Sequence, residues 1–449
     1  MSWRFTVAMV AALLEVVVCP VAAQMIDAPP GAVRALFGGA SSRQRLTLTV
    51  GGDWGIDDNQ SPQPAPLEDD LLVLQSGQAA TVLAALDYQR GRLGRFVMAS
   101  GTAAVNYQQI GAQQGTNRLF RSDLTFQGLT NIGQRSGVQG AATVAYEPAT
   151  LFGALDSLGA VLEEEPNLDP VVAPPASSSV AVTTQRWLST QVAGSVYHSW
   201  TPRQRMDVRY EASRREPING AGLEAQAQAI SVFHAWSPNP NGGVDVNYRF
   251  DDRPQLFENG FEQPFRSHTA EGRVRFGRPQ SPRRAWAVLV GAGAVRTTTR
   301  TEDTAGDFSF VAPIGSASFR YEMSRNWAMA FAGRRDVTVL GGLSVEPFSS
   351  NAAVLSLNGV VARRMTLGAS TSYSRGTSRV SDTGGFTMVA ADLQLRYGLS
   401  PRLGLLFRYN YADHRLSDVS VVSSTFPNRF ASNSFRVGIT TWLPMFGSF

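Results

Sequence analysis

The sequence predicts an all-β fold, a single transmembrane antiparallel up-and-down β-barrel of about 18 strands, with about 16 as the alternative. Three observations predict it. From residue 44 onward, segments of about ten residues alternate apolar and polar side chains, the two-residue period of strands with one apolar face. The links between these segments alternate between short and long. No uncharged apolar run approaches the roughly 20 residues that a membrane-spanning helix needs.

The composition fits this prediction and excludes several classes of protein. Charged residues make up 17% of the 449 residues, against roughly 25% in an average soluble domain. The 8 Trp, 11 Tyr and 24 Phe exclude a disordered chain. All 40 basic residues are Arg, but the net charge of +4 is too small, and the Arg too scattered, to indicate nucleic-acid binding. Two classes remain, a large soluble β protein and a membrane barrel.

The N-terminus predicts export from the cytoplasm. Arg4 supplies a basic start, Phe5–Val18 an apolar stretch, and Val21-Ala22-Ala23 a small-residue cleavage site. The only cysteine, Cys19, leaves with this signal peptide, so the mature chain has no disulfide and no thiolate metal site. The predicted organisation is a signal peptide at 1–23, a periplasmic N-terminal segment at 24–43 and the barrel at 44–449.

The clearest alternating segment begins at Leu403 and ends at Tyr411. One face carries Leu403, Leu405, Phe407, Tyr409 and Tyr411, and the other carries Gly404, Leu406, Arg408, Asn410 and Ala412. The same period occurs at 205–212, 244–251, 271–276 and 389–397. Both faces carry apolar residues at 184–200 and 225–236, which leaves those segments ambiguous. The choice between 18 and 16 strands depends on 44–55 and 308–323.

The links between the segments are of two kinds. The short links are Gly91–Gly94, Asn131–Gly137, Thr201–Gln204, Ser237–Gly243, Arg278–Arg284, Ser324–Asn326, Arg363–Arg364 and Ser400–Arg402. The longer and more polar stretches are 56–70, 108–116, 148–183, 215–224, 252–265, 301–307, 340–350, 376–384 and 417–432. A soluble sandwich has no reason to sort its loops by length into two ends, whereas a membrane barrel has short periplasmic turns and long external loops.

Aromatic residues cluster near the short links and the C-terminus. We expect a periplasmic girdle, a ring of amphipathic side chains at the lipid headgroups, made of Trp200, Trp236, Trp286, Trp327, Tyr397 and Trp442. The chain then ends in an aromatic residue, Phe449, after an alternating strand. The chain combines a signal peptide, alternating segments, an aromatic girdle and a terminal aromatic residue. In these features it resembles bacterial outer-membrane β-barrel proteins of the porin type, and the resemblance covers nearly all of residues 44–449.

This resemblance implies a location in the bacterial outer membrane and contact with its lipids and lipopolysaccharide. It also implies that the barrel-assembly machinery reads Phe449 as its recognition signal. The turns at Thr201-Pro202-Arg203, Ser281-Pro282-Arg283 and Ser400-Pro401-Arg402 also resemble uncharacterised barrels of exopolysaccharide gene clusters. That second likeness would add polysaccharide-export proteins as partners. No nucleic-acid partner and no cofactor are expected, and the oligomeric state stays open.

A barrel of 16–18 strands can enclose an aqueous channel. The polar strand faces predict pore-lining candidates, namely Arg205, Arg209, Arg249, Arg273, Arg275, Arg320, Arg396, Arg408, Asp207, Glu211, Asp245 and Asp392. One interpretation is cross-strand ion pairs that stiffen the wall. The other is a charged, water-filled pore in which the excess of Arg favours anions or acidic sugars. The sequence leaves both open.

The longest loop, 148–183, is the third external loop. Leucines spaced as on a helix precede Glu163, Glu164 and Glu165 and a Pro-rich stretch. In general porins the third loop folds inward and narrows the pore with acidic residues, and the resemblance implies the same role for these three glutamates. An exposed, partly disordered loop is the alternative.

We do not expect the protein to be an enzyme, and we expect neither catalytic residues nor a metal site. The four His do not pair at metal-ligand spacing, and no Gly-x-Ser-x-Gly motif occurs. Asp413 and His414 are adjacent, so on a strand they face opposite ways. Three hypotheses remain. These are a porin-like channel for small hydrophilic solutes, an outer-membrane component of exopolysaccharide export, and a non-conducting structural or surface barrel.

Overall fold

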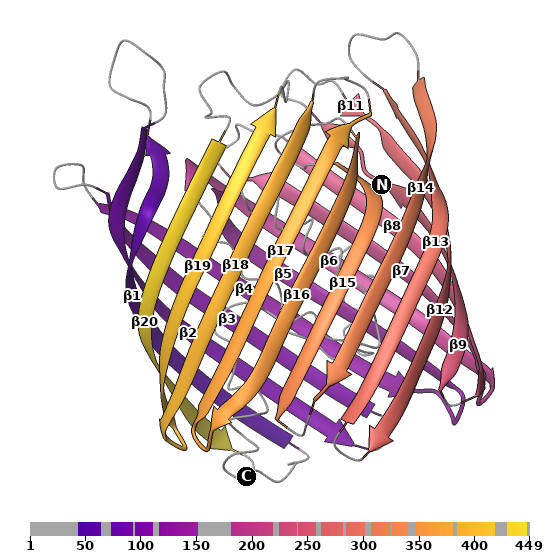
Figure 1. The fold of residues 1–449 in the computed structure, drawn as a ribbon, viewed down its shortest axis with the longest axis horizontal. Helices are drawn as coiled ribbons and strands as arrows, with labels where there is room; N and C mark the ends of the chain where they lie inside the picture. The colour runs from indigo at the N-terminus through magenta and orange to yellow at the C-terminus, as the bar shows by residue number, and fades with distance from the viewer. Residues whose placement is uncertain are drawn as a thin grey trace.

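The computed structural model is one closed antiparallel β-barrel with strongly tilted strands (Figure 1). It describes residues 44–63, 73–92, 95–110, 116–150, 181–218, 224–239, 241–256, 262–281, 284–300, 307–323, 326–339, 347–379, 384–417 and 429–446. Within these ranges no helix is long and apolar enough to cross a membrane. The predicted signal peptide, the segment 24–43, the glutamates 163–165 and Phe449 all lie outside the described residues.

Eighteen strands form the wall, as predicted. The first nine are β1 (Gln44–Gln63), β2 (Val73–Arg92), β3 (Arg95–Ile110), β4 (Thr116–Asn131), β5 (Ser136–Thr150), β6 (Ala181–Thr201), β7 (Gln204–Pro217), β8 (Glu224–Asn239) and β9 (Gly242–Asp252). The other nine are β12 (Phe265–Ser281), β13 (Arg284–Arg300), β14 (Asp307–Glu322), β15 (Trp327–Val339), β16 (Pro347–Ala362), β17 (Met365–Ser378), β18 (Gly385–Ser400), β19 (Leu403–Ser417) and β20 (Arg429–Phe446). The uncertain segments 44–55 and 308–323 are both strands, which excludes the 16-stranded alternative.

Each wall strand pairs with its neighbours along the chain, and the barrel closes where β1 pairs with β20. Leu48 lies opposite Leu443, and Ile56 lies opposite Phe435. Two further strands, β10 (Gln255–Leu256) and β11 (Glu262–Gln263), form a small hairpin at one end, where β10 also pairs with β8. The topology is therefore up-and-down throughout the wall.

The short links lie where the sequence predicts them, and local side chains stabilise several of them. The Oγ1 atom of Thr201 accepts a hydrogen bond from the Arg203 N–H at 3.2 Å, and Ser400 Oγ accepts one from Arg402 N–H at 3.2 Å. Asn239 Oδ1 does the same for Asn241 N–H at 2.9 Å. Such side chains replace the missing ladder partners of a tight turn. Gly133 has a φ of 135°, which favours glycine.

The two faces of the wall differ in the way a membrane barrel requires. Large apolar side chains on the outer face, such as Val82, Val196 and Ile439, are about half exposed. On the inner face, small polar side chains such as Thr49 and Ser195 are buried between their neighbours. This arrangement inverts that of a soluble protein, because the apolar face has no protein to cover it and requires lipid.

The strands are longer than the segments of about ten residues that the alternation indicates. They range from 11 residues in β9 to 21 in β6. Crossing the hydrocarbon takes only about 9–11 residues of a tilted strand, so the additional length extends past it. This length was hidden in the sequence because the extracellular ends of the strands are as polar as the loops that they enter.

One interval of the wall lacks a regular ladder. Strand β14 pairs with β15 only from Gly315, opposite Arg335, to Glu322. Beyond that point the Val337 N–H donates to the Oδ1 atom of its neighbour Asp336, at 2.8 Å. Val337 also packs against an apolar cluster that includes Val295 and Ile314. Side-chain packing therefore closes the β14–β15 seam in its extracellular half.

Candidate pore-lining site

All twelve predicted pore-lining residues lie on the inner face of the wall. On β7, for example, Arg209 and Glu211 alternate with Val208 and Tyr210, whose side chains are about 40% exposed on the outer face. Cross-strand partners share a face, so the register extends this assignment around the barrel. Arg273 lies opposite Asp245. Arg408 lies opposite Gln394 of β18, and Asp392 and Arg396, two residues to either side of Gln394, share its face.

The densest group of charges lies on β7, β9 and β12, and we call their inner faces the charged wall. It comprises Arg205, Asp207, Arg209, Glu211, Asp245, Arg249, Asp251, Glu271, Arg273 and Arg275. Strand β8 runs between β7 and β9, and its inner side chains between Glu211 and Asp251 and between Arg209 and Arg249 are the small Ala229 and Ser231. Because these side chains are short, long side chains on β7 and β9 reach one another across β8.

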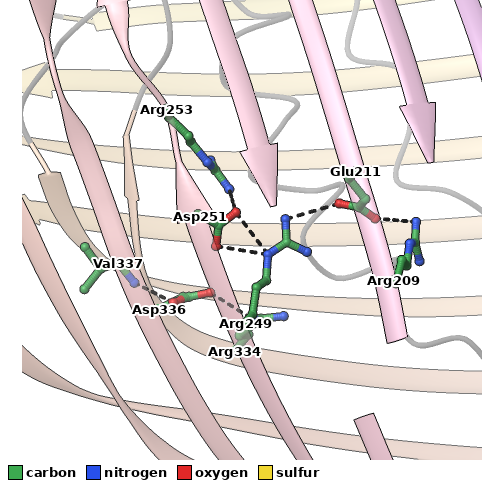
Figure 2. A network of polar contacts seen from close by, with 8 residues as sticks. All are labelled: Arg209, Glu211, Arg249, Asp251, Arg253, Arg334, Asp336 and Val337. Carbon is green, nitrogen blue, oxygen red and sulfur yellow. Dashed lines mark hydrogen bonds and ion pairs between the residues drawn. The ribbon is translucent and has the colours of Figure 1, made fainter. Parts of the chain in front are cut away.

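Figure 2 shows the result, a chain of alternating charges. Arg209 pairs with Glu211, whose Oε2 atom also lies 3.3 Å from Arg249 Nη2. The Nε atom of Arg249 is 3.0 Å from both carboxylate oxygens of Asp251, and Arg253 Nη2 is 3.1 Å from Oδ1 of Asp251. Three guanidinium groups thus share two carboxylates, which leaves this network with a net positive charge.

Further ion pairs continue around the inner face. They are Arg205–Asp207 at 3.1 Å, Arg275–Asp245 at 3.5 Å, Arg320–Glu322 at 3.1 Å, Arg334–Asp336 at 2.8 Å, Arg408–Asp392 at 2.8 Å and Arg436–Asp53 at 3.4 Å. Arg273 has its guanidinium 5.6 Å from the Phe233 ring centre, and Arg396 donates to Gln394 Oε1 at 3.1 Å. The pairs support the interpretation of these residues as a stiffened wall.

In the charged wall, the carboxylate of a pair is less exposed than its arginine partner, and this supports the other interpretation as well. In the Arg320–Glu322 pair the order is reversed, with 21% and 45% of the side chains exposed. The carboxylates of Asp245, Asp251 and Asp392 are 4–7% exposed. In contrast, the side chains of Arg205, Arg209 and Arg253 are 37–45% exposed. Short acids lie close to the backbone, whereas long arginines project inward with their heads in solvent. At the charged wall, a solute inside the barrel therefore meets mainly guanidinium groups.

The inner faces of β16 and β17 differ sharply, and we call them the hydroxyl wall. Their inner positions include Ser350, Ser356, Thr366, Ser370, Ser372, Ser374 and Ser378. No inner-facing residue that the structure describes on these two strands is charged. The barrel interior is therefore asymmetric, with its densest charges on β7, β9 and β12 and none among the described inner residues of β16 and β17.

Several charged residues of the lining escaped the sequence analysis, among them Asp53, Arg334 and Asp336. Arg334 and Arg335 are adjacent on β15, and only the register shows that Arg334 faces inward, opposite Ser316. Asp53 and Arg436 are 383 residues apart and meet because β1 and β20 close the barrel. The strand closure was predicted, but its register has no signal in the sequence.

Five of the six residues predicted to form the periplasmic girdle lie on the outer face of the wall. Trp200, Trp236 and Tyr397 lie on the outer face near short links, with 40–47% of each side chain exposed. Trp286 lies opposite the outward Tyr321, and Trp327 lies opposite Gly359 on the same face.

Trp442 departs from this girdle, because it lies between the outward residues Thr441 and Leu443 and therefore faces inward. It is opposite Thr49, and its ring lies against Gly404. The position of Trp442 near the C-terminus led to its inclusion in the girdle, but that position does not determine which face of the strand carries the side chain.

Asp413 and His414 lie on opposite faces of β19, as the alternation predicts. Asp413 accepts hydrogen bonds from the outward Arg415 and Arg429, whereas His414 is buried on the inner face opposite Met388. These two side chains are on different sides of the wall. They do not form a catalytic pair.

The closed barrel, its apolar outer face and its polar inner face place the chain in the bacterial outer membrane, in contact with membrane lipid. Closure is what allows strands to cross lipid, because it leaves no edge with unpaired backbone groups.

No family model and no curated protein matches the sequence. Among solved structures, OccK11 (OpdR) of Pseudomonas aeruginosa is similar over 90% of this chain and 96% of its own, with 13% identity and a TM-score of 0.41. OccAB2 of Acinetobacter baumannii is similar over 91% and 100%, with 10% identity and a TM-score of 0.45. The ferric-catecholate import receptor Fiu of E. coli K12 is similar over 90% and 82%, with 7% identity and a TM-score of 0.44.

Proposed function

We propose that the protein is an outer-membrane channel for small hydrophilic solutes, and that it prefers anions. One observation carries the proposal: the carboxylates of the charged wall are 4–15% exposed, while their partners Arg205, Arg209, Arg253 and Arg275 are 32–45% exposed to the interior. Exposed side chains on an inner face require space and water next to them. An 18-stranded barrel is wide enough to supply both.

The charged wall would act on solutes through its field. Guanidinium groups line one part of the circumference, and clefts lined by charge of one sign raise the local concentration of counter-ions. Planar guanidinium forks also bind carboxylate and phosphate groups in a bidentate manner. The hydroxyl wall offers hydrogen bonds without charge.

A planar-bilayer recording with the purified full chain tests the proposal. We expect discrete conductance steps and, in a KCl gradient, a reversal potential of the sign that marks chloride preference. The double variant Arg209→Gln/Arg253→Gln removes both exposed ends of the Figure 2 network. The ratio of chloride to potassium permeability should fall roughly two- to fivefold, as for exposed charges worth about 0.5–1 kcal/mol.

The matched control is Arg266→Gln, which removes an arginine paired with Asp252 on the outer face. It should leave the permeability ratio unchanged. A folded barrel without conductance would overturn the channel. Conductance with a ratio that the double variant does not alter would overturn the anion preference.

A further inference from the structure

Four arginines lie on the outer face at the extracellular end of the last six strands. They are Arg335 on β15, Arg375 on β17, Arg415 on β19 and Arg429 on β20, and all four are exposed. We call them the basic rim. The register joins them in one row across the sheet, through the pairs Arg335–Asn351, Asn351–Arg375, Arg375–Thr387, Thr387–Arg415 and Arg415–Arg429.

The basic rim is poorly neutralised. On the outer face of β15 to β20, as far as these strands are described, the one acidic residue is Asp413. Its oxygens accept hydrogen bonds from Arg415 Nη2 at 3.0 Å and from Arg429 Nε at 3.0 Å. Asp413 is 7% exposed, whereas the side chains of Arg415 and Arg429 are 59% and 60% exposed. One buried acid thus orients two guanidinium groups outward.

The outer face of β7, β9 and β12, as far as it is described, is balanced. Arg214 pairs with Glu216 on β7 at 3.0 Å, and Arg266 of β12 pairs with Asp252 of β9 at 3.3 Å. There, each arginine has its own carboxylate partner. On β13, one further outward arginine, Arg296, lies opposite His268 and Val311. A row of four outward arginines with a single acid is found on β15 to β20.

The depth of the basic rim indicates what lies against it. Arg335, Arg375 and Arg415 follow the first residues of β15, β17 and β19 by 8, 10 and 12 positions. At about 2.5 Å of height per residue in a tilted strand, they lie roughly 20–30 Å above the periplasmic turns. The apolar band of such barrels is about 25 Å tall. The rim is therefore at the outer headgroup level.

Exposed apolar side chains lie directly below the rim on the same strands, among them Phe331, Leu355, Tyr373 and Leu393. The surface thus combines an apolar band with unneutralised guanidinium groups above it. A partner that satisfies both is an amphiphile with acyl chains and an anionic head. Phosphate suits the head, because it accepts bidentate hydrogen bonds from arginine.

We propose that the basic rim binds the phosphate groups of lipid A, the acylated and phosphorylated glycolipid anchor of lipopolysaccharide in the outer leaflet. Its acyl chains would lie along the apolar band of β15 to β18. This binding is independent of the channel, because the rim and the pore lining are on opposite faces of the wall.

Lipid A binding to the full barrel, measured by native mass spectrometry from detergent with added lipid, tests the proposal. The probes are lipid A with both phosphates and the same lipid after phosphatase treatment. We expect the phosphorylated form to bind about tenfold more tightly, as charge-assisted hydrogen bonds imply. The variant Arg335→Gln/Arg375→Gln should reduce this preference at least about threefold, while the Asp413 cluster stays intact.

The matched control is Arg214→Gln/Arg266→Gln, which removes two arginines from the balanced side and should retain the preference. Equal binding of both lipid forms would overturn the proposal, as would an equal loss in the control or equal binding of phosphatidylglycerol. Heat-dependent gel mobility verifies that each variant is folded. Unchanged single-channel conductance in the Arg335→Gln/Arg375→Gln variant separates this result from that of the proposed function.

Discussion

The charged wall and the hydroxyl wall have the same backbone architecture and opposite chemistry. In the first, Asp251 and its neighbours form ion pairs in which the acids are buried and the arginines project inward. In the second, inner side chains such as Ser370 and Ser374 are short and buried. The comparison teaches that the β-ladder holds the barrel together on both sides. Side-chain charge therefore serves the interior, and the hydroxyl wall does without it.

The largest expected difference between the walls concerns stability. Asp251→Asn leaves Arg249 and Arg253 without their shared carboxylate. Removing one partner of a buried pair is strongly destabilising, and solvent at Arg253 reduces the loss to roughly 2–3 kcal/mol of unfolding free energy. Urea unfolding of the barrel in lipid vesicles measures it. A loss below about 0.5 kcal/mol would show that the network contributes little to the wall.

A smaller effect is expected when charge is added to the hydroxyl wall. Ser372 faces inward on β17, opposite Val354 and Ala390. Ser372→Arg and Ser372→Asp both lengthen the side chain, so both should lower the conductance modestly. The chloride preference should rise with Arg and fall with Asp, each by roughly twofold. Reversal potentials in a KCl gradient measure this, and shifts of the same sign in both variants would contradict the electrostatic account.

The smallest effect is expected from removing a hydroxyl. Ser374→Ala keeps the shape of a buried inner side chain and should change the unfolding free energy by no more than about 0.5–1 kcal/mol. Ion selectivity should not change, because no charge is altered. A selectivity shift as large as that of the Arg209→Gln/Arg253→Gln variant would abolish the distinction between the two walls.

The sequence was sufficient to predict the barrel, its strand number and its short turns. Alternation is a local property, and each short link carries turn residues such as Pro202 or Pro401. The ambiguous segments 184–200 and 225–236 lie in β6 and β8. Their inner residues explain why the alternation was unclear there. Tyr197, Ala193 and Phe233 face inward there, so both strand faces are apolar.

The site was predicted less completely than the fold. In clear segments such as the one that contains Arg249 and Asp251, the two-residue alternation identified the face that each charged side chain occupies. It did not identify which charged side chains meet across strands. The contact between Glu211 and Arg249 spans β8 and depends on the register of three strands. The outward arginines were missed because the alternating pattern leads one to expect every charged side chain on the inner face. Arg375, near the end of β17, lies on the outer face instead.

The β14–β15 seam has a consequence for the position of the barrel in its membrane. Inside hydrocarbon, a backbone N–H or C=O group without a hydrogen bond costs several kcal/mol. The ladder between these strands ends at the pair Gly315–Arg335. We therefore expect strand β14 above Gly315 to lie in the headgroup layer or in water. The end of the ladder marks the outer surface of the membrane on the protein, and Arg335 is at that level.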